Sequence, residues 1–287
     1  MAIAYGSSVG GIVTPIGTPP NLILLGFLET HSIDPIPFVQ WIGYTFPLAV
    51  IMLTIIPFIL SLGVKNFELE KGFDDVMILN GEQKRLLYIL LTLVVLLLTN
   101  SKIEPYYSGL GLNEKGILLG FGLLMFLPKL GFLTWDDTKK IPYEIIFLFG
   151  AGFSIADAVS STGLAQELAS NLLVLTNLPV FIMILLIATM ITFTTEITSN
   201  TALISIALPI IYSLGQVANL DITLVLFVAT ICASYAFMLP IATPPNAIAM
   251  SSKVVKVKDM AKYGLLFNIL GIIFITIIAL VYWQFFI

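Results

Sequence analysis

The chain is a series of long apolar runs joined by short polar segments. A helix that crosses the hydrocarbon layer, roughly 30 Å thick, needs about 20 largely apolar residues at about 1.5 Å of rise per residue. The apolar runs predict transmembrane helices at residues 38–64, 86–100, 116–130, 145–159 and 263–287. We therefore predict an all-α, polytopic membrane protein.

Two further apolar segments are interrupted by nearly the same motif. Residues 15–21 read Pro-Ile-Gly-Thr-Pro-Pro-Asn and residues 240–246 read Pro-Ile-Ala-Thr-Pro-Pro-Asn, a match at six of seven positions, 225 residues apart. In each motif the Thr suits a helix N-cap, and the Pro after it suits the first helical position, where an N–H is not needed. The motifs predict broken transmembrane helices over residues 3–30 and 221–252, each with a second half that begins inside the membrane.

The start of such a half-helix is a candidate anion site. Its free N–H groups and positive dipole end favour negative charge, and paired broken helices are typical of transporter substrate sites. We expect Thr18 and Thr243 to contact an anionic substrate from the two breaks, and Pro19 and Pro244 to shape the pocket.

A polar stretch at residues 196–202 (Glu-Ile-Thr-Ser-Asn-Thr-Ala) lies between two apolar arms, residues 179–195 and 203–214. The second arm would cover only about 18 Å as a helix, which is less than the bilayer thickness. These residues therefore predict a re-entrant helical hairpin with its polar tip at membrane depth. Asn200 and Thr201 would donate hydrogen bonds to a substrate carboxylate beside Ser199; in the alternative, these residues only cap the helix that follows.

At these residues the chain resembles a known family. Ser-Asn-Thr at 199–201, followed by Ala-Thr-Pro-Pro-Asn at 242–246 and matched by Gly-Thr-Pro-Pro-Asn at 17–21, is similar to the divalent anion/sodium symporter family of sodium-coupled di- and tricarboxylate transporters. The resemblance covers essentially the whole chain, as the carboxy-terminal part of that family. It implies an inverted-repeat transporter whose first repeat is incomplete here, with a first hairpin upstream of Met1, and a homodimer when full length.

The resemblance also implies two sodium sites and no organic cofactor. The first would be formed by side chains or carbonyls of four residues: Thr195, Thr198, Asn200 and Ala242. The second would include Gly17, with its remaining ligands in the missing hairpin. Hydroxyl, amide and carbonyl oxygens suit this hard cation.

Other polar and aromatic residues are expected to have structural roles. Asn21 and Asn246 should satisfy backbone groups that the breaks set free, and Glu196 should brace the hairpin or tune sodium electrostatics, because a carboxylate would repel an anionic substrate. Trp41 and Tyr44 are expected near one membrane interface.

Four regions follow from this scheme: residues 1–64 as the remainder of the first repeat, 65–85 as a cytoplasmic linker, 86–176 as scaffold-type spans with an interfacial helix, and 177–287 as the hairpin, broken helix and last span. Eleven of the 13 basic residues fall on the side of the linker, which places that side in the cytoplasm. The hairpin would then enter from outside.

Composition excludes several other classes. The chain is 58% hydrophobic and 10% charged with a mean hydropathy of +1.03, unlike a soluble domain, and its net charge of −4 gives no reason to expect a nucleic-acid partner. Cys232 alone allows neither a disulfide framework nor a multi-thiolate metal site. The sequence has no metalloprotease or phosphate-loop motif, so we do not expect an enzyme.

The predicted function is sodium-coupled symport of a divalent anion across the cytoplasmic (plasma) membrane, with a C4-dicarboxylate such as succinate as the expected substrate. Three alternatives remain open: a sodium-independent dicarboxylate exchanger, a carrier of sulfate or another oxyanion, and a truncated fragment of such a carrier that does not transport.

Overall fold

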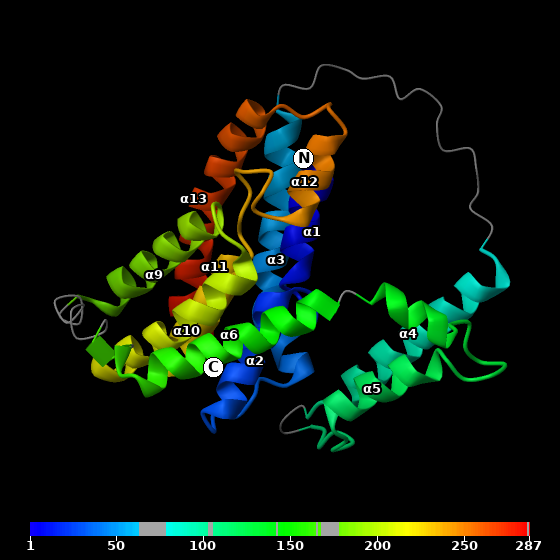
Figure 1. Cartoon of the computed structure of the whole chain (residues 1–287). Coiled ribbons are helices and arrows are strands. Elements are labelled where there is room, and N and C mark those ends of the chain that lie inside the picture. Colours follow the sequence, from blue (N-terminus) through cyan, green and yellow to red (C-terminus); the bar gives the residue numbers. More distant parts are fainter. Residues whose placement is uncertain (63–78, 103–105, 142, 165, 168–177, 286) are drawn as a thin grey trace. The chain divides into compact units, whose positions relative to one another are not determined.

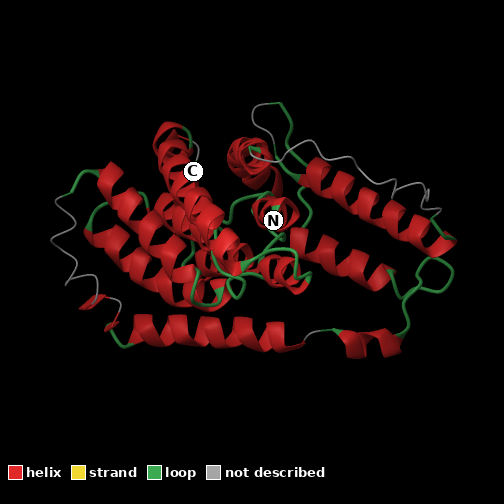
Figure 2. Cartoon of the chain, turned by 90° about the horizontal axis from the view of Figure 1, so that it is seen from above, coloured by secondary structure: helices red, strands yellow, loops and turns green. Residues whose placement is uncertain are grey.

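The computed structural model describes residues 1–62, 79–102, 106–141, 143–164, 166–167, 178–285 and 287. All regular structure in these residues is helical (Figures 1 and 2). The α-helices are α1 (Ala2–Gly11), α2 (Pro19–Thr30), α3 (Phe38–Ser61), α4 (Gly81–Asn100), α5 (Glu114–Leu124), α6 (Tyr143–Ser161), α9 (Val180–Thr195), α10 (Asn200–Val217), α11 (Ile222–Ala233), α12 (Pro244–Ser251) and α13 (Val257–Val281). Two 3₁₀ turns complete the set, at Trp135–Lys140 and Trp283–Phe285.

Three of these helical segments are long and apolar enough to cross a membrane: Phe38–Ser61, Asn200–Val217 and Val257–Phe285. The predicted all-α, multi-pass membrane protein is thereby confirmed. The chain packs as two compact units, one of Met1–Ile36, Trp41–Gly63 and Glu144–Ile287, the other of Pro37–Gln40 and Val64–Tyr143. The functional division into four regions stays a prediction, and residues 63–78 and 168–177 lie outside the part that the structure describes.

Helix α11 forms the centre of the larger unit. Every residue from Leu224 to Ala233 is buried, and α11 packs against α2, α9, α10 and α13. A helix that is apolar on all sides is expected in such a central position. Phe227 on α11 forms T-shaped contacts with two buried indoles, Trp41 at 5.0 Å and Trp283 at 4.8 Å between ring centroids.

The two broken helices run in opposite directions, as an inverted repeat requires. The first residues of α1 (Met1, Ile3, Ala4) line a groove together with residues at and beyond the end of α12 (Ser252, Val254). Figure 1 shows α1 and α2 descending while α11 and α12 ascend.

Helix α10 is longer than predicted. We expected an arm over residues 203–214, but α10 covers Asn200–Val217, 18 residues or about 27 Å. The helix begins within the predicted tip, with Ser199 at the N-cap position, and Pro209 lies inside the helix without ending it. The short-arm argument for re-entry is therefore wrong, and the re-entrant geometry stays a prediction.

Trp41 and Tyr44, which are expected near a membrane interface, are both buried against protein. The Trp41 indole Nε1 donates to the Ile12 carbonyl at 2.9 Å, and its ring packs on Phe227. The position of the two residues relative to the membrane interface stays a prediction.

In the smaller unit, α4 packs against α5. Helix α4 begins five residues earlier than predicted because Asn80 and Gln83 form a reciprocal capping box at its start. The loop after α4 is held by Asn100, whose side-chain amide both donates to and accepts from the backbone of Leu112.

Candidate functional site

The first helix break separates α1 from α2. Thr18 is the N-cap of α2 in an extended conformation, and Pro19 takes the first helical position as predicted. The Asn21 amide Nδ2 donates to the carbonyls of Thr14 at 2.9 Å and Gly11 at 3.3 Å. Because Asn21 is fully buried, these bonds provide partners for backbone groups that water cannot reach.

The second break, between α11 and α12, has the same construction. Thr243 is the N-cap of α12, and its hydroxyl accepts from the Asn246 backbone N–H. The Asn246 Nδ2 donates to the carbonyls of Leu239 at 3.1 Å and Ala236 at 3.0 Å. These carbonyls precede Asn246 by 7 and 10 residues, the same intervals as in the first break. The broken helices and the backbone-satisfying role of both asparagines are confirmed.

Two side chains of α3 form hydrogen bonds with backbone carbonyls of the first break. Trp41 donates to the Ile12 carbonyl, and the buried Thr45 hydroxyl lies 3.2 Å from the Val13 carbonyl and 2.9 Å from the carbonyl of Trp41. Together with the two bonds from Asn21, side chains thus lie within hydrogen-bond distance of four consecutive carbonyls, residues 11–14. Irregular backbone at membrane depth is tolerated when protein groups satisfy it in this way.

Glu196 joins the hairpin tip to the second break. Its carboxylate accepts from the backbone N–H groups of Met238 and Leu239, both at 2.9 Å, and from the Asn268 side chain of α13 at 2.6 Å. Asn268 in turn accepts from the Phe237 N–H. Glu196 is buried. The expectation that it braces the hairpin is confirmed.

The hairpin tip also contains a cluster of three oxygen atoms. The buried Thr195 hydroxyl lies 2.5 Å from Asn200 Oδ1 and 2.9 Å from the Ala233 carbonyl. A hydroxyl has one hydrogen, so it can donate to only one of these acceptors at a time. The second acceptor, either Asn200 Oδ1 or the Ala233 carbonyl oxygen, then receives no hydrogen bond from this hydroxyl. Such a surplus of oxygen acceptors suits a hard cation such as sodium.

The structure brings some of the predicted site residues together and leaves others apart. Thr195 and Asn200 are in contact, whereas the exposed Thr198, in the turn after α9, donates its hydroxyl to the Thr194 carbonyl of α9. Ser199 is exposed and its side chain makes no capping bond, so side-chain capping does not explain its presence. Thr201 is buried.

In the two breaks, Ala242 and Thr243 are buried, while Gly17 and Pro19 are exposed. A side chain at Gly17 would overlap the Gly11 carbonyl, which explains the glycine. Pro244 is exposed at the first position of α12.

Four residues of this site were not predicted: Trp41, Thr45, Ala233 and Asn268. Asn268 carried a usable signal, since it is an amide within the apolar stretch Gly264–Ile275 of α13, and such residues usually have a hydrogen-bond partner. The others act through ordinary side-chain or backbone groups that no local pattern distinguishes.

This geometry defines the class of the protein. It is an integral, multi-pass helical membrane protein with repeated, discontinuous helices, an architecture typical of secondary transporters. The chain belongs to the sodium:sulfate symporter family, because the model of that family's transmembrane region matches residues 1–287. The predicted resemblance is thereby confirmed.

Individual relatives agree with this assignment. The chain is 28% identical to the sodium-dependent dicarboxylate transporter SdcS of Staphylococcus saprophyticus, over 97% of this chain and 57% of the relative. It is 33% identical to solute carrier family 13 member 2 of Mus musculus (96% and 56%) and 30% identical to member 1 of Homo sapiens (95% and 54%). The chain therefore spans little more than half the length of these relatives.

Proposed function

We propose that this chain is the ion- and substrate-binding part of a sodium-coupled carrier for a divalent anion, with a C4-dicarboxylate such as succinate as the substrate. The observation that carries the proposal is the buried oxygen cluster of Thr195, Asn200 and Ala233, which the Glu196 contacts tie to the break before Thr243. Membership of the sodium:sulfate symporter family and the sodium-dependent dicarboxylate transporter among the relatives support it.

Sodium is the coupling ion in this proposal. Thr195 Oγ1 and Asn200 Oδ1 would hold it, with backbone oxygens of Thr198 and Ala242 as further ligands. A second sodium site would use Gly17 together with residues of a further hairpin. The bound cations supply positive charge next to the anion site, and no organic cofactor takes part.

The dianion would bind where the two half-helices begin. Thr18 and Thr243 would contact it, Pro19 and Pro244 would shape the pocket, and the tip residues (Ser199, Asn200, Thr201) would donate to its carboxylate. Glu196 does not compete with the dianion for these donors, because its two carboxylate oxygens already accept from the Met238 and Leu239 N–H groups and from the Asn268 amide. Its negative charge instead partly balances the bound cation.

Cation and anion binding are coupled through the tip. Asn200 would contribute to both: its amide Oδ1 lies 2.5 Å from the Thr195 hydroxyl, and its place at the start of α10 would let it donate to the substrate. Sodium bound first would fix the orientation of this amide, and the dianion would then meet a preorganised site. The family resemblance implies that the full-length protein is a homodimer in the lipid bilayer. In that dimer, alternating access would carry this site past the scaffold region.

The proposal is tested by uptake into proteoliposomes that contain the full-length protein. Sodium-driven succinate uptake is expected, with loss of uptake when choline replaces sodium or when Asn200 is replaced by alanine. The exposed Thr54→Val variant, whose hydroxyl bonds only within its own helix, is the matched control and should keep full uptake. Succinate uptake that ignores sodium would indicate an exchanger, and uptake intact in Asn200→Ala would remove Asn200 from the site.

Sulfate is the second candidate substrate, because the matching family description names it. Competition by excess sulfate against labelled succinate decides between them: strong competition favours an oxyanion carrier of broad specificity. A parallel assay on the 287-residue chain alone shows whether the chain transports by itself or is a non-transporting fragment.

A further inference from the structure

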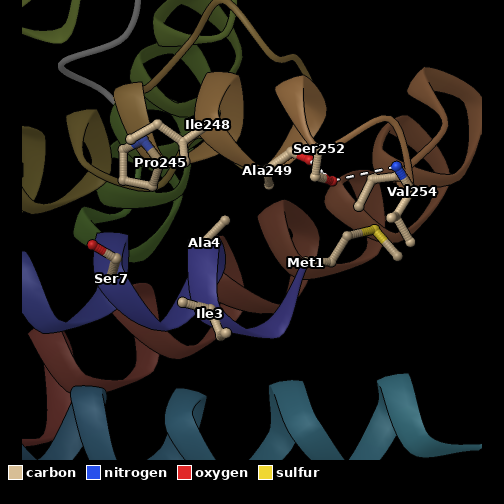
Figure 3. Close-up of a pocket in the computed structure, with 10 residues that line it drawn as sticks. Met1, Ile3, Ala4, Ser7, Pro245, Ile248, Ala249, Ser252 and Val254 are labelled. Carbon is tan, nitrogen blue, oxygen red and sulfur yellow. Dashed lines mark hydrogen bonds between the residues drawn. The ribbon is translucent and has the colours of Figure 1, made fainter. Parts of the chain in front are cut away.

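The turn from α12 into α13 carries a concentration of positive charge. Residues 253–262 contain one acidic residue, Asp259, and four lysines: Lys253, Lys256, Lys258 and Lys262. The side chains of all five residues are exposed. The turn is closed by the Val254 N–H, which donates to the Ser252 hydroxyl at 3.3 Å (Figure 3).

These four lysines form no ion pair with the part of the chain that the structure describes. The ion pairs there are Lys139–Asp136 and Lys140–Asp137, both at 2.8 Å. Four lysines against one aspartate give residues 253–262 a net charge of +3. Ammonium groups held this close together repel one another, so a ligand that supplies negative charge is attracted to the segment.

Two of the lysines continue an exposed apolar stripe on α13. The stripe consists of side chains four residues apart: Leu265, Ile269, Ile273, Ile277 and Val281, each at least 39% exposed. Residues three or four apart lie on the same face of a helix. Lys262 precedes Leu265 by three residues and Lys258 precedes Lys262 by four, so both lysines lie on the face of the stripe.

The length of this helical segment places the lysines at the level of the lipid headgroups. Val257–Phe285 has 29 residues, whereas the hydrocarbon layer requires about 20, so part of the segment extends beyond it. The first turn carries Lys258 and is the charged end. Lys262 follows, with its Nζ 6.0 Å from the centroid of the Tyr263 ring. Tyrosine is enriched at membrane interfaces, and a lysine stem lies along apolar surface while its ammonium reaches polar surroundings.

We propose that the lysine segment, residues 253–262, binds anionic phospholipids through their headgroup phosphates. The acyl chains lie along the apolar stripe of α13, and the phosphate lies between Lys258 and Lys262, one helical turn apart. The exposed Val254 and Val257 add apolar contacts beside the headgroup. Phosphatidylcholine binds more weakly, because the lysines repel the positive charge of its choline.

The predicted topology agrees with this ligand. The four lysines belong to the eleven basic residues on the predicted cytoplasmic side, and the cytoplasmic leaflet is the one with the negative surface potential. The proposal concerns the lipid contact and holds whichever anion the chain carries.

The paired lysines of the smaller unit provide a matched control. Lys139 and Lys140 lie on the same predicted side of the membrane, but their aspartate partners neutralise them. The double variants Lys258→Gln/Lys262→Gln and Lys139→Gln/Lys140→Gln change the net charge equally. A third double variant, Lys258→Arg/Lys262→Arg, keeps the charge. Each full-length protein is immobilised in detergent and equilibrated with phosphatidylglycerol or phosphatidylcholine, both labelled in the acyl chain, and the retained lipid is measured over a range of concentrations.

The parent protein should bind phosphatidylglycerol at least about tenfold more tightly than phosphatidylcholine at low salt. This preference should decrease in about 1 M salt, where screening acts over roughly 3 Å. Lys258→Gln/Lys262→Gln should lose most of the preference, whereas the arginine variant and the Lys139→Gln/Lys140→Gln control should keep it.

Three results would overturn the proposal. The first is an undiminished preference in Lys258→Gln/Lys262→Gln, and the second is an equal loss in the arginine variant or in the control. The third is displacement of phosphatidylglycerol by millimolar inorganic phosphate, because the segment would then bind a free anion without the acyl chains.

Discussion

Replacing Asn246 by alanine tests the construction of the second break most directly. The substitution removes the two side-chain bonds to the carbonyls of Ala236 and Leu239, in a region where both Asn246 and Ala236 are buried. Both carbonyls lie between α11 and α12, outside either helix. The Leu239 carbonyl keeps a second donor, the Ala242 backbone N–H at 3.2 Å, so the substitution mainly affects the buried Ala236 carbonyl.

The expected cost follows from the number of groups left unsatisfied. One buried polar group without a partner costs about 1–3 kcal/mol, so the loss of the bond to the Ala236 carbonyl should lower the free energy of unfolding by about 1–3 kcal/mol. Each kcal/mol lowers the melting temperature of a folded unit of about 150–250 residues by about 2–4 °C, so a decrease of at least about 2 °C is expected.

The measurement is thermal unfolding of the purified protein in detergent, followed by intrinsic fluorescence. Asn21→Ala removes the equivalent pair of bonds from the first break and should cause a decrease of similar size. Ser251→Ala on the exposed side of α12 is the control and should change stability by less than about 0.5 kcal/mol. A melting temperature of Asn246→Ala equal to that of the control would refute the reasoning, since it would mean that the Ala236 carbonyl does not depend on Asn246.

Three further predictions concern the ion cluster, the packing of α13 and a solvent-exposed turn. Thr195→Val keeps the side-chain shape but removes the hydroxyl at the oxygen cluster, so the sodium concentration for half-maximal uptake should rise about tenfold, and an unchanged sodium dependence would contradict the site. Gly264→Ala should destabilise by about 1–3 kcal/mol in the same thermal assay, because a Cβ there overlaps the backbone of the second break, whereas Gly43→Ala meets open space and should not. Hydrogen bonding to the Lys140 ammonium is the main cause that lowers the pKa of Asp137 to about 2, below its ordinary 3.8; the contribution of this contact to stability is therefore present above pH 3.8 and lost as the pH falls through about 2. Carboxyl-carbon NMR titration measures this pKa, and Lys140→Ala should raise it; an Asp137 pKa near 3.8 in the parent protein would contradict the contact.

Much of the site could be predicted from the sequence because its signals are local. The Thr-Pro-Pro-Asn motif specifies a helix start through the N-cap and the proline that follows it, and both breaks occur where this chemistry places them. Asn21 and Asn246 reach carbonyls only 7 and 10 residues away, so their role also follows from the motif.

Other features could not be predicted because they depend on residues distant in sequence. Glu196 reaches Asn268 across 72 residues and Thr195 reaches Ala233 across 38. The second arm of the hairpin was predicted too short because hydropathy alone did not show that the helix begins at Asn200 and continues beyond Leu214 to Val217.

The sequence by itself determined that the chain is a helical membrane protein with two equivalent breaks and a polar hairpin tip, because apolar length, proline position and capping residues act over a few residues. Only the tertiary structure decided which oxygens converge, how Trp41 and Thr45 satisfy the first break, and which face of α1 and α12 stays uncovered. These outcomes depend on the packing of whole helices, and a buried backbone group takes whatever donor or acceptor that packing brings within reach.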